Sequence, residues 1–248
     1  MADDILQVRK LCKSFGAVQA CSNLSFNVER GHIHALIGPN GAGKTTIVNQ
    51  LSGELKQDSG SIIFNSVDIS DFPIYRRVAA GLGRSFQITS IFDNLSVAEN
   101  MTLAILADNG HNYRFWKRSY KAESVKKYLI PALTRVDLID KAARSAGSLS
   151  HGEKRQLEVG MALVGNPDLL MLDEPMAGLG AGGTVELMKL INQLKGQMTI
   201  LLVEHDMDVV FSLAHRISVI VYGACIASGS PAEIRSNPEV QKAYLGEN

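Results

Sequence analysis

The chain has 248 residues, of which 46% are hydrophobic and 20% are charged. This suits one large or two small globular domains with an adequate core. Its 25 Lys and Arg residues balance 25 Asp and Glu residues, which argues against a nucleic-acid-binding surface built on clustered basic charge.

Three further features bound the protein class. The three cysteines are scattered and lack metal-ligand spacing, which indicates reduced thiols in a cytosolic protein. The chain begins with the acidic pair Asp3 and Asp4, and its first ten residues lack an apolar core, so no signal peptide is expected. The apolar run at 217–227 is too short to span a bilayer, and any membrane role must therefore come through a partner.

Strand and helix patterns alternate over the first third of the chain. In order, we expect strands at 5–11, 18–28 and 32–37, a helix beginning at 45–51, a strand at 61–64 and a helix at 74–80. Residues 13–16 are expected to form a turn, and Pro73 is placed to begin the helix that follows it.

The section from 87 to 148 has a helical character. Ser96 and Glu99 form a capping-box pattern before 101–106. The run 114–129 is basic with interleaved aromatic residues, which favours a solvated helix face or a surface near lipid headgroups over nucleic-acid binding. Pro131 is expected to begin another helix that extends to 138.

After Gly152 the alternation of helices and strands returns. We expect helices at 153–164, 184–194, 207–214, 231–235 and 238–245, and strands at 169–172, 199–203, 217–222 and 225–227. This order predicts an α/β fold with a mostly parallel sheet and short antiparallel additions.

The segment 38–46, GPNGAGKTT, has the spacing of a phosphate-binding P-loop. Its glycines allow successive backbone N–H groups to turn toward a phosphate chain. Lys44 would bring its charge to the β- and γ-phosphates, and the Thr45 hydroxyl would bind Mg²⁺. The expected nucleotide-binding residues here are Gly38, Pro39, Asn40, Gly41, Ala42, Gly43, Lys44, Thr45 and Thr46.

Two acids follow the apolar strand 169–172. Asp173 would hold Mg²⁺ at the end of this strand, and Glu174 could accept a proton from the attacking water. Upstream, Ser150 can cap a helix while Gly152 permits close approach. This is a second helix N-terminus that could receive phosphate, although taken alone a plain helix cap is the simpler interpretation.

As a set, these motifs resemble those of ATP-binding-cassette (ABC) ATPases, in order and spacing and over nearly the whole chain. More narrowly, the chain resembles the ATP-binding subunit of a bacterial branched-chain, hydrophobic amino-acid importer, through GRSFQ…IFDNLSVAENM, VEHDM and AYLGE. The resemblance implies one cassette over 1–248. Segments 1–86 and 149–248 would form a P-loop NTPase core with a mixed sheet and an antiparallel β subdomain, and 87–148 a helical signature subdomain.

The resemblance also implies roles for single residues. Phe15 would stack on adenine. Gln87 would sense Mg²⁺ and the γ-phosphate and couple to the membrane subunit, with the loop 87–99 as the docking segment. His205 would bond the γ-phosphate and hold the attacking water. Ser150 and Gly152 would act across a dimer, on the γ-phosphate held by a second cassette subunit.

Implied cofactors are ATP and Mg²⁺. Implied partners are a second cassette subunit, identical or different, two membrane permease subunits and, indirectly, an extracytoplasmic substrate-binding protein, with no nucleic acid. The expected location is peripheral, on the cytoplasmic face of the inner membrane. The chain departs from the family pattern at His151, Glu153 and Gly180. Gly180 stands where an Asp is usual, which puts a cross-dimer contact of that carboxylate in doubt.

Other functions remain open at this point. The same ATPase could serve import of urea or short amides, or lipopolysaccharide export. A soluble cassette acting on DNA or ribosomes would usually carry coiled coils or two cassettes. A P-loop small-molecule kinase would have no use for 149–153 or for His205, and ATP turnover without an added acceptor would exclude it.

Overall fold

The computed structural model describes residues 3–85, 91–108 and 122–245. Gln87 and residues 114–121 of the basic run lie outside this part. The chain divides into two compact units. The first comprises Met1–Arg84, Asp168–Pro175 and Leu194–Asn248, and the second comprises Ser85–Pro167 and Met176–Gln193. The expected boundaries of the helical subdomain at 87–148 stay a prediction.

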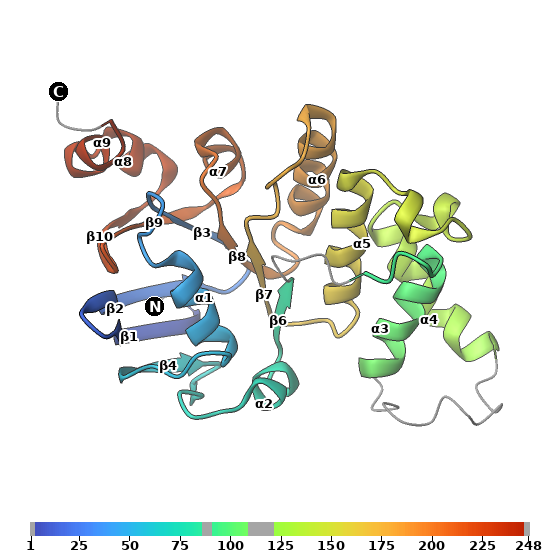
Figure 1. Ribbon diagram of the computed structural model, residues 1–248, viewed down its shortest axis with the longest axis horizontal. Helices are drawn as coiled ribbons and strands as arrows, with labels where there is room; N and C mark the ends of the chain where they lie inside the picture. The colour runs from blue at the N-terminus through green and yellow to red at the C-terminus, as the bar shows by residue number, and fades with distance from the viewer. Residues whose placement is uncertain (1–2, 86–90, 109–121, 246–248) are drawn as a thin grey trace. The chain divides into compact units, whose positions relative to one another are not determined.

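The first unit contains two sheets (Figure 1). The four-stranded antiparallel sheet has the order β2 (Val18–Glu29), β1 (Asp4–Phe15), β4 (Ser59–Phe64), β5 (Val67–Asp68). The six-stranded sheet has the order β10 (Ala224–Gly229), β9 (Arg216–Val221), β3 (Ile33–Ile37), β8 (Thr199–Val203), β7 (Leu169–Asp173), β6 (Leu82–Ser85). Strands β9, β3, β8 and β7 run parallel, and β10 is antiparallel to β9.

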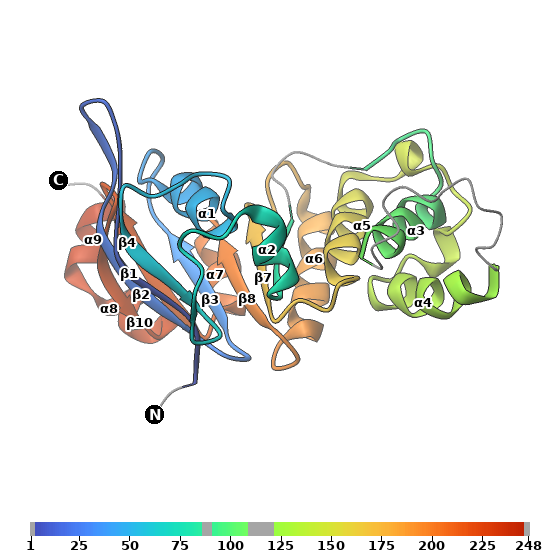
Figure 2. The same cartoon turned by 90° about the horizontal axis from the view of Figure 1, so that it is seen from below.

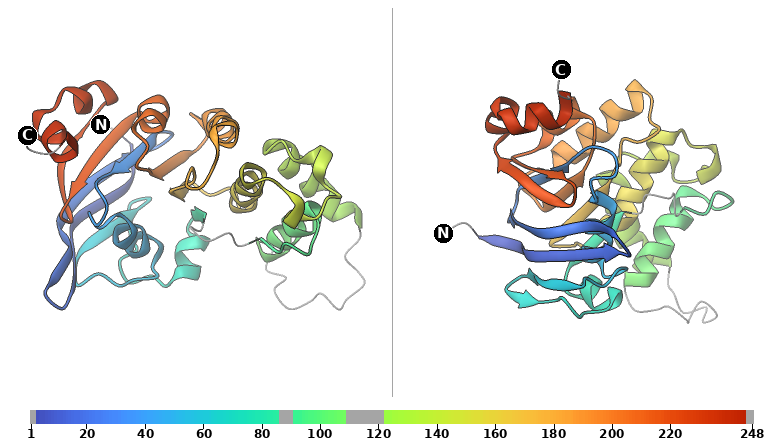
Figure 3. Two further views of the ribbon diagram at one scale, coloured as in Figure 1. Left: turned by 45° about the horizontal axis from the view of Figure 1, so that its top comes forward. Right: turned by 60° about the vertical axis from the view of Figure 1, so that its left-hand side comes forward.

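Strands β3, β7 and β8 are buried at every position because both faces of this sheet are covered. On one face, helix α1 (Lys44–Ser52) lies between the two sheets and shares their apolar core. On the other face, apolar residues of β3 and β9 pack with α7 (Met207–Leu213), α8 (Pro231–Ser236) and α9 (Pro238–Leu245). Figure 2 and Figure 3 show α8 and α9 beside β10.

The second unit is helical. Its helices are α3 (Val97–Asp108), α4 (Ala122–Arg135), α5 (His151–Leu163) and α6 (Ala181–Leu194), with 3₁₀ turns at Ile139–Lys141 and Ala146–Ser148. Gly160 lets α5 pack closely against α3, since a Cβ on Gly160 would lie 2.8 Å from Met101 Cε of α3. The capping box before α3 is present: the Ser96 amide donates to Glu99 Oε2 at 2.7 Å, and the Glu99 amide donates to Ser96 Oγ at 3.2 Å.

Most of the predicted elements are confirmed within a few residues, but some are not. Pro131 does not begin a helix, because it lies inside α4. A proline removes the hydrogen bond to the carbonyl four residues earlier, and here both Pro131 and Lys127 are exposed, so water can reach that carbonyl. Strands β5 and β6 were not expected. Each is too short to show alternation, and β6 forms beside β7 in the sheet.

Candidate nucleotide-binding and catalytic site

Three parallel strands carry the predicted site residues to one edge of the sheet. Leu36 of β3 pairs with Val203 of β8, and Val203 pairs with Asp173 of β7. The P-loop, Glu174 and His205 all follow within two residues of this row. Neighbouring strands are about 4.8 Å apart, so the three strand ends lie within roughly 10 Å of one another. The parallel register therefore gathers the P-loop, the two acids and the histidine.

Glycines fix the shape of the P-loop. Gly41 and Gly43 have φ of 79° and 99°, which lie in the left-handed region that favours glycine. A Cβ on Gly38 would lie 2.2 Å from the Ile220 carbonyl oxygen, and a Cβ on Gly43 would lie 2.2 Å from the Ala20 carbonyl oxygen. A side chain at either position would displace the backbone packed beside the loop.

The turn between β9 and β10 is hydrogen-bonded to the P-loop. The Gly223 amide donates to the Ala42 carbonyl at 3.0 Å, and the Ser22 amide donates to the Gly223 carbonyl at 2.9 Å. Gly223 has a φ of 75°, and a Cβ there would lie 2.7 Å from the Ala20 carbonyl oxygen. The turn thus joins the P-loop to strand β2.

The Lys44 side chain folds back onto the P-loop and binds two of the loop's backbone carbonyls. Its Nζ donates to the carbonyls of Gly38 at 2.6 Å and Pro39 at 3.1 Å. Burial lowers the pKa of Lys44, and the nearby carboxylates of Glu174 and Asp173 oppose this shift. The lysine is therefore held among acids at the mouth of the loop, where phosphate oxygens can replace the carbonyls as its acceptors.

Helix α1 begins at this loop. Its N-cap is Gly43, which provides no side-chain acceptor for the amides of the first turn. Unsatisfied amides and the positive end of the helix dipole favour an anion at this position. Thr45 is exposed and Thr46 is half-buried in this first turn.

Asp173 is the buried acid of the site, at 1% exposure. Its Oδ2 lies 3.2 Å from Arg84 Nη2, whereas its Oδ1 is buried with no hydrogen-bond partner among the described residues. Burial raises the pKa of Asp173, and the Arg84 charge opposes this rise. A buried carboxylate oxygen left unsatisfied is costly unless a ligand completes it, and Mg²⁺ prefers such an oxygen.

Glu174 is held in an unusual backbone conformation. Its φ is 46°, and its amide donates to the Val203 carbonyl at 2.9 Å. A non-glycine residue in the left-handed region carries a strain cost and often marks a functional site. The half-buried side chain follows directly after Asp173, and its role as general base for the attacking water stays a prediction.

His205 is exposed at the end of β8, with 57% of its side chain accessible. The fully buried Glu204 supports it: the His205 amide donates to Glu204 Oε2 at 3.1 Å, and Nδ1 lies 3.7 Å from the same oxygen. Glu204 and Arg84 were not predicted as site residues. In the sequence, each of them is only a single charged residue at a short strand. Glu204 follows the apolar strand β8, and Arg84 lies next to a glycine in β6.

Phe15 is half-exposed at the end of β1. The prediction of a turn at 13–16 is wrong, because β1 continues through Phe15 to its partner Val18. Lys13 Nζ lies 5.7 Å from the Phe15 ring centroid and also pairs with Asp58 at 2.7 Å. The ring therefore stands on an ordered strand end and is half-exposed to solvent.

The signature residues belong to the second unit. Ser150 is exposed and caps α5 in a capping box with Glu153, which also pairs with Lys141 at 2.7 Å. This pairing lowers the pKa of Glu153. A Cβ on Gly152 would lie 2.9 Å from Gly183 Cα, so Gly152 allows the starts of α5 and α6 to touch.

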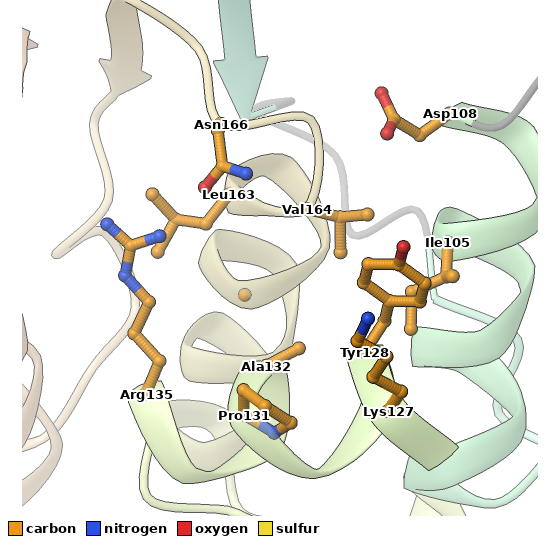
Figure 4. A pocket seen from close by; sticks show the side chains of 11 residues that line it. Ile105, Asp108, Lys127, Tyr128, Pro131, Ala132, Arg135, Leu163, Val164 and Asn166 are labelled. Atoms are coloured by element: carbon orange, nitrogen blue, oxygen red, sulfur yellow. The ribbon is translucent and has the colours of Figure 1, made fainter. Parts of the chain in front are cut away.

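The second unit also contains a pocket of about 250 Å³ beside α3, α4 and α5. Figure 4 shows Ile105 and Tyr128 on one side of it and Leu163 and Asn166 on the other. None of the predicted nucleotide-binding or catalytic residues that the structure describes lines this pocket. It is therefore separate from the P-loop site.

The P-loop at a parallel sheet edge, the two acids at the end of β7 and the histidine after β8 define an ATP-binding-cassette ATPase. The chain belongs to the ABC transporter family, whose model matches residues 21–177. A second model, described as a branched-chain amino acid ATP-binding cassette transporter, matches residues 224–248. The predicted family, fold class and ATPase activity are thereby confirmed.

Individual relatives match along the full length. The chain is 37% identical to the high-affinity branched-chain amino acid transport ATP-binding protein BraF of Pseudomonas aeruginosa, over 100% of both chains. It is 36% identical to LivG of Escherichia coli, again over 100% of both chains. The solved ADP conformation of MJ1267, an ATP-binding cassette of an ABC transporter, superposes with a TM-score of 0.85 at 30% identity, covering 98% of this chain and 99% of that one.

One structural finding bears on the membrane. Across residues 3–85, 91–108 and 122–245, no helix combines the length and apolar character needed to cross a bilayer.

Proposed function

We propose that this chain is the ATP-hydrolysing subunit of an importer for branched-chain or other hydrophobic amino acids. The observation that carries the proposal is the similarity to branched-chain amino acid transport ATP-binding proteins at 36–37% identity over whole chains. The C-terminal match at 224–248 to a branched-chain amino acid cassette model supports the same cargo.

In the proposed reaction, the P-loop amides and Lys44 bind the phosphates of ATP. The hydroxyl of Thr45 and the free Oδ1 of Asp173 would hold Mg²⁺, which neutralises charge on the β- and γ-phosphates. Glu174 accepts the proton of the attacking water, and His205 bonds the γ-phosphate. A role for Gln87 stays a prediction, because this residue lies outside the described part of the chain.

The proposed active form is a pair of cassettes. Ser150 and Gly152 at the start of α5 would close on the γ-phosphate held by the partner cassette. Two permease subunits, supplied with cargo by an extracytoplasmic binding protein, would convert opening and closing of this pair into transport from the cytoplasmic face of the inner membrane. Gly180 supplies no carboxylate to the contact, and a Cβ there would meet no described atom within 4 Å.

Turnover of Mg·ATP by the purified chain tests the chemistry, with Glu174→Gln as the diagnostic variant. This variant should keep ATP affinity, lose turnover by on the order of 10²–10⁴-fold, and accumulate as an ATP-dependent dimer in size-exclusion chromatography. Glu239→Gln, an exposed acid on α9, makes the same charge change and should behave as wild type. Full turnover by Glu174→Gln, or a monomer only, would contradict these roles.

Cargo needs a separate test. The complex with its permeases and binding protein, reconstituted in vesicles, should hydrolyse ATP faster with leucine or isoleucine than without. Stimulation by urea or a short amide instead, or by lipopolysaccharide, would replace the cargo while leaving the ATPase chemistry intact. Equal turnover with and without permeases would favour a soluble cassette.

A further inference from the structure

Arg84, at the end of β6, joins two parts of the first unit. Its side chain is only 9% exposed. Nη2 lies 3.2 Å from Asp173 Oδ2, and Nη1 lies 2.9 Å from Glu54 Oε1 and 3.0 Å from Ser52 Oγ. Ser52 is the last residue of α1, so one guanidinium group spans from the end of the P-loop helix to the acid at the end of β7.

This contact leaves the two oxygens of Asp173 in different states. Oδ2 is held by Arg84, whereas Oδ1 is buried and finds no partner in the described residues. A planar guanidinium fixes the orientation of a carboxylate more firmly than an ammonium does, because its donors are rigidly spaced. The carboxylate therefore cannot rotate freely to satisfy Oδ1 elsewhere.

Charge could in principle work against a metal here, since a cation lies beside the acid. Glu54 offsets that cation at 2.9 Å, so Arg84, Glu54 and Asp173 together carry one net negative charge. Without Arg84, the buried Asp173 and the partly exposed Glu54 would have no cation between them, which favours rotation of the acids away from each other. The effect of Arg84 on the orientation of Asp173 is thus larger than its electrostatic repulsion of a metal ion.

We propose that Arg84 is a positioning residue of the magnesium site, which presents Asp173 Oδ1 to the metal and ties Asp173 to helix α1. This rests on the proposed function, in which Asp173 and Thr45 hold Mg²⁺. Because Thr45 lies in the first turn of α1 and Ser52 ends that helix, the Arg84 contact also constrains how Asp173 lies relative to Thr45. Loss of a group that orients a metal ligand typically costs 10–100-fold in metal affinity.

The test compares the full chain with Arg84→Gln, Arg84→Lys and the control Arg76→Gln. Arg76 is an exposed arginine on α2 (Ile74–Ala79) that lies over the Phe72 ring. A fluorescent ATP analogue reports nucleotide affinity in EDTA and then during titration with Mg²⁺. Electron paramagnetic resonance of Mn²⁺ gives metal affinity directly, without turnover.

Arg84→Gln should raise the half-saturating Mg²⁺ concentration about 10–100-fold while the nucleotide affinity in EDTA stays within about twofold. Arg84→Lys should recover part of the loss, and Arg76→Gln should match wild type. If Arg84→Gln does not fold, Glu54→Gln weakens the contact at the other end of the guanidinium and should produce a smaller rise in the same direction.

Three results would overturn the proposal: an unchanged or lower Mg²⁺ requirement in Arg84→Gln, an equal loss of affinity in EDTA and in Mg²⁺, or, where Glu54→Gln has to be used, no rise in that variant. A wild-type chain whose nucleotide and Mn²⁺ binding do not depend on each other would instead remove the magnesium site itself, and with it the proposed mechanism.

Discussion

The Lys44 ammonium nitrogen lies 2.6 Å from the carbonyl oxygen of Gly38, the first residue of its own loop. The P-loop thus carries an internal ligand for its lysine. Nucleotide binding must exchange this contact for phosphate oxygens, and the exchange is favourable because a phosphate oxygen carries negative charge, whereas the Gly38 carbonyl oxygen is neutral.

Lys44→Ala should weaken ATP binding on the order of 100-fold, since each lost hydrogen bond to a charged group costs about 1.5–3 kcal/mol. Isothermal calorimetry with Mg·ATP measures this. Lys56→Ala removes an exposed lysine that pairs with Asp71 and should leave the affinity unchanged. Unaltered binding in Lys44→Ala would show that the P-loop does not hold the phosphates.

Ser150→Ala and Ser230→Ala form a matched pair, because each serine caps a helix in a capping box with a glutamate three residues later. Each variant should lose about 1 kcal/mol of unfolding free energy, measured by urea denaturation. Only Ser150→Ala should also slow ATP hydrolysis, by about tenfold or more, because only α5 is proposed to contact nucleotide across the dimer. Equal turnover by the two variants would reduce Ser150 to a helix cap.

Phe15→Ala should weaken nucleotide binding about tenfold, since stacking of a base on an aromatic ring is worth roughly 1–3 kcal/mol. Phe15→Trp should retain the affinity. Val18→Ala, on the strand residue paired with Phe15, removes apolar surface without removing an aromatic face and serves as the control. If Val18→Ala costs as much as Phe15→Ala, the ring is only part of the hairpin packing.

His34 should make folding sensitive to acid. Burial lowers its pKa to about 3, and the charge of Arg216 adds to this; Nε2 lies 2.9 Å from Ser218 Oγ. Between pH 6.5 and 3 the unfolded chain binds a proton at this histidine and the folded chain does not, so the unfolding free energy falls as pH falls.

The loss should be about 2 kcal/mol between pH 7 and 5. His34→Leu should remove that part of the slope in urea unfolding at the two pH values, because leucine does not titrate and Ser218 Oγ keeps a partner in Ser228 Oγ at 3.0 Å. An identical slope in His34→Leu would mean that other groups cause the acid sensitivity.

Local pattern was sufficient for most of the fold. The P-loop strand, α1 and the β7 acids follow from apolar runs that end at glycine or acidic residues, and their order predicts the parallel sheet. The prediction that Pro131 begins a helix was wrong. Proline is common in the first turn of a helix, but here it lies inside α4 at an exposed position that tolerates it. Strand β6 depends on pairing with β7 and has too little pattern of its own.

The candidate site was predictable where it follows a motif and was not where it depends on tertiary contacts. Lys44, Asp173 and Glu174 could be chosen from spacing alone. The contacts of Arg84 with Glu54 and Asp173 could not, because they join segments far apart in sequence. The same holds for the positive φ of Glu174, which the Val203 hydrogen bond supports.

The Gly223 turn has a consequence for biosynthesis. Ala42 is translated early, but its carbonyl is bonded to an amide that is made close to the end of the chain. A nascent polypeptide still in the ribosomal tunnel therefore lacks the brace that shapes its nucleotide cradle, since segments fold as they emerge. The complete P-loop geometry can therefore form only after most of the chain has been synthesised.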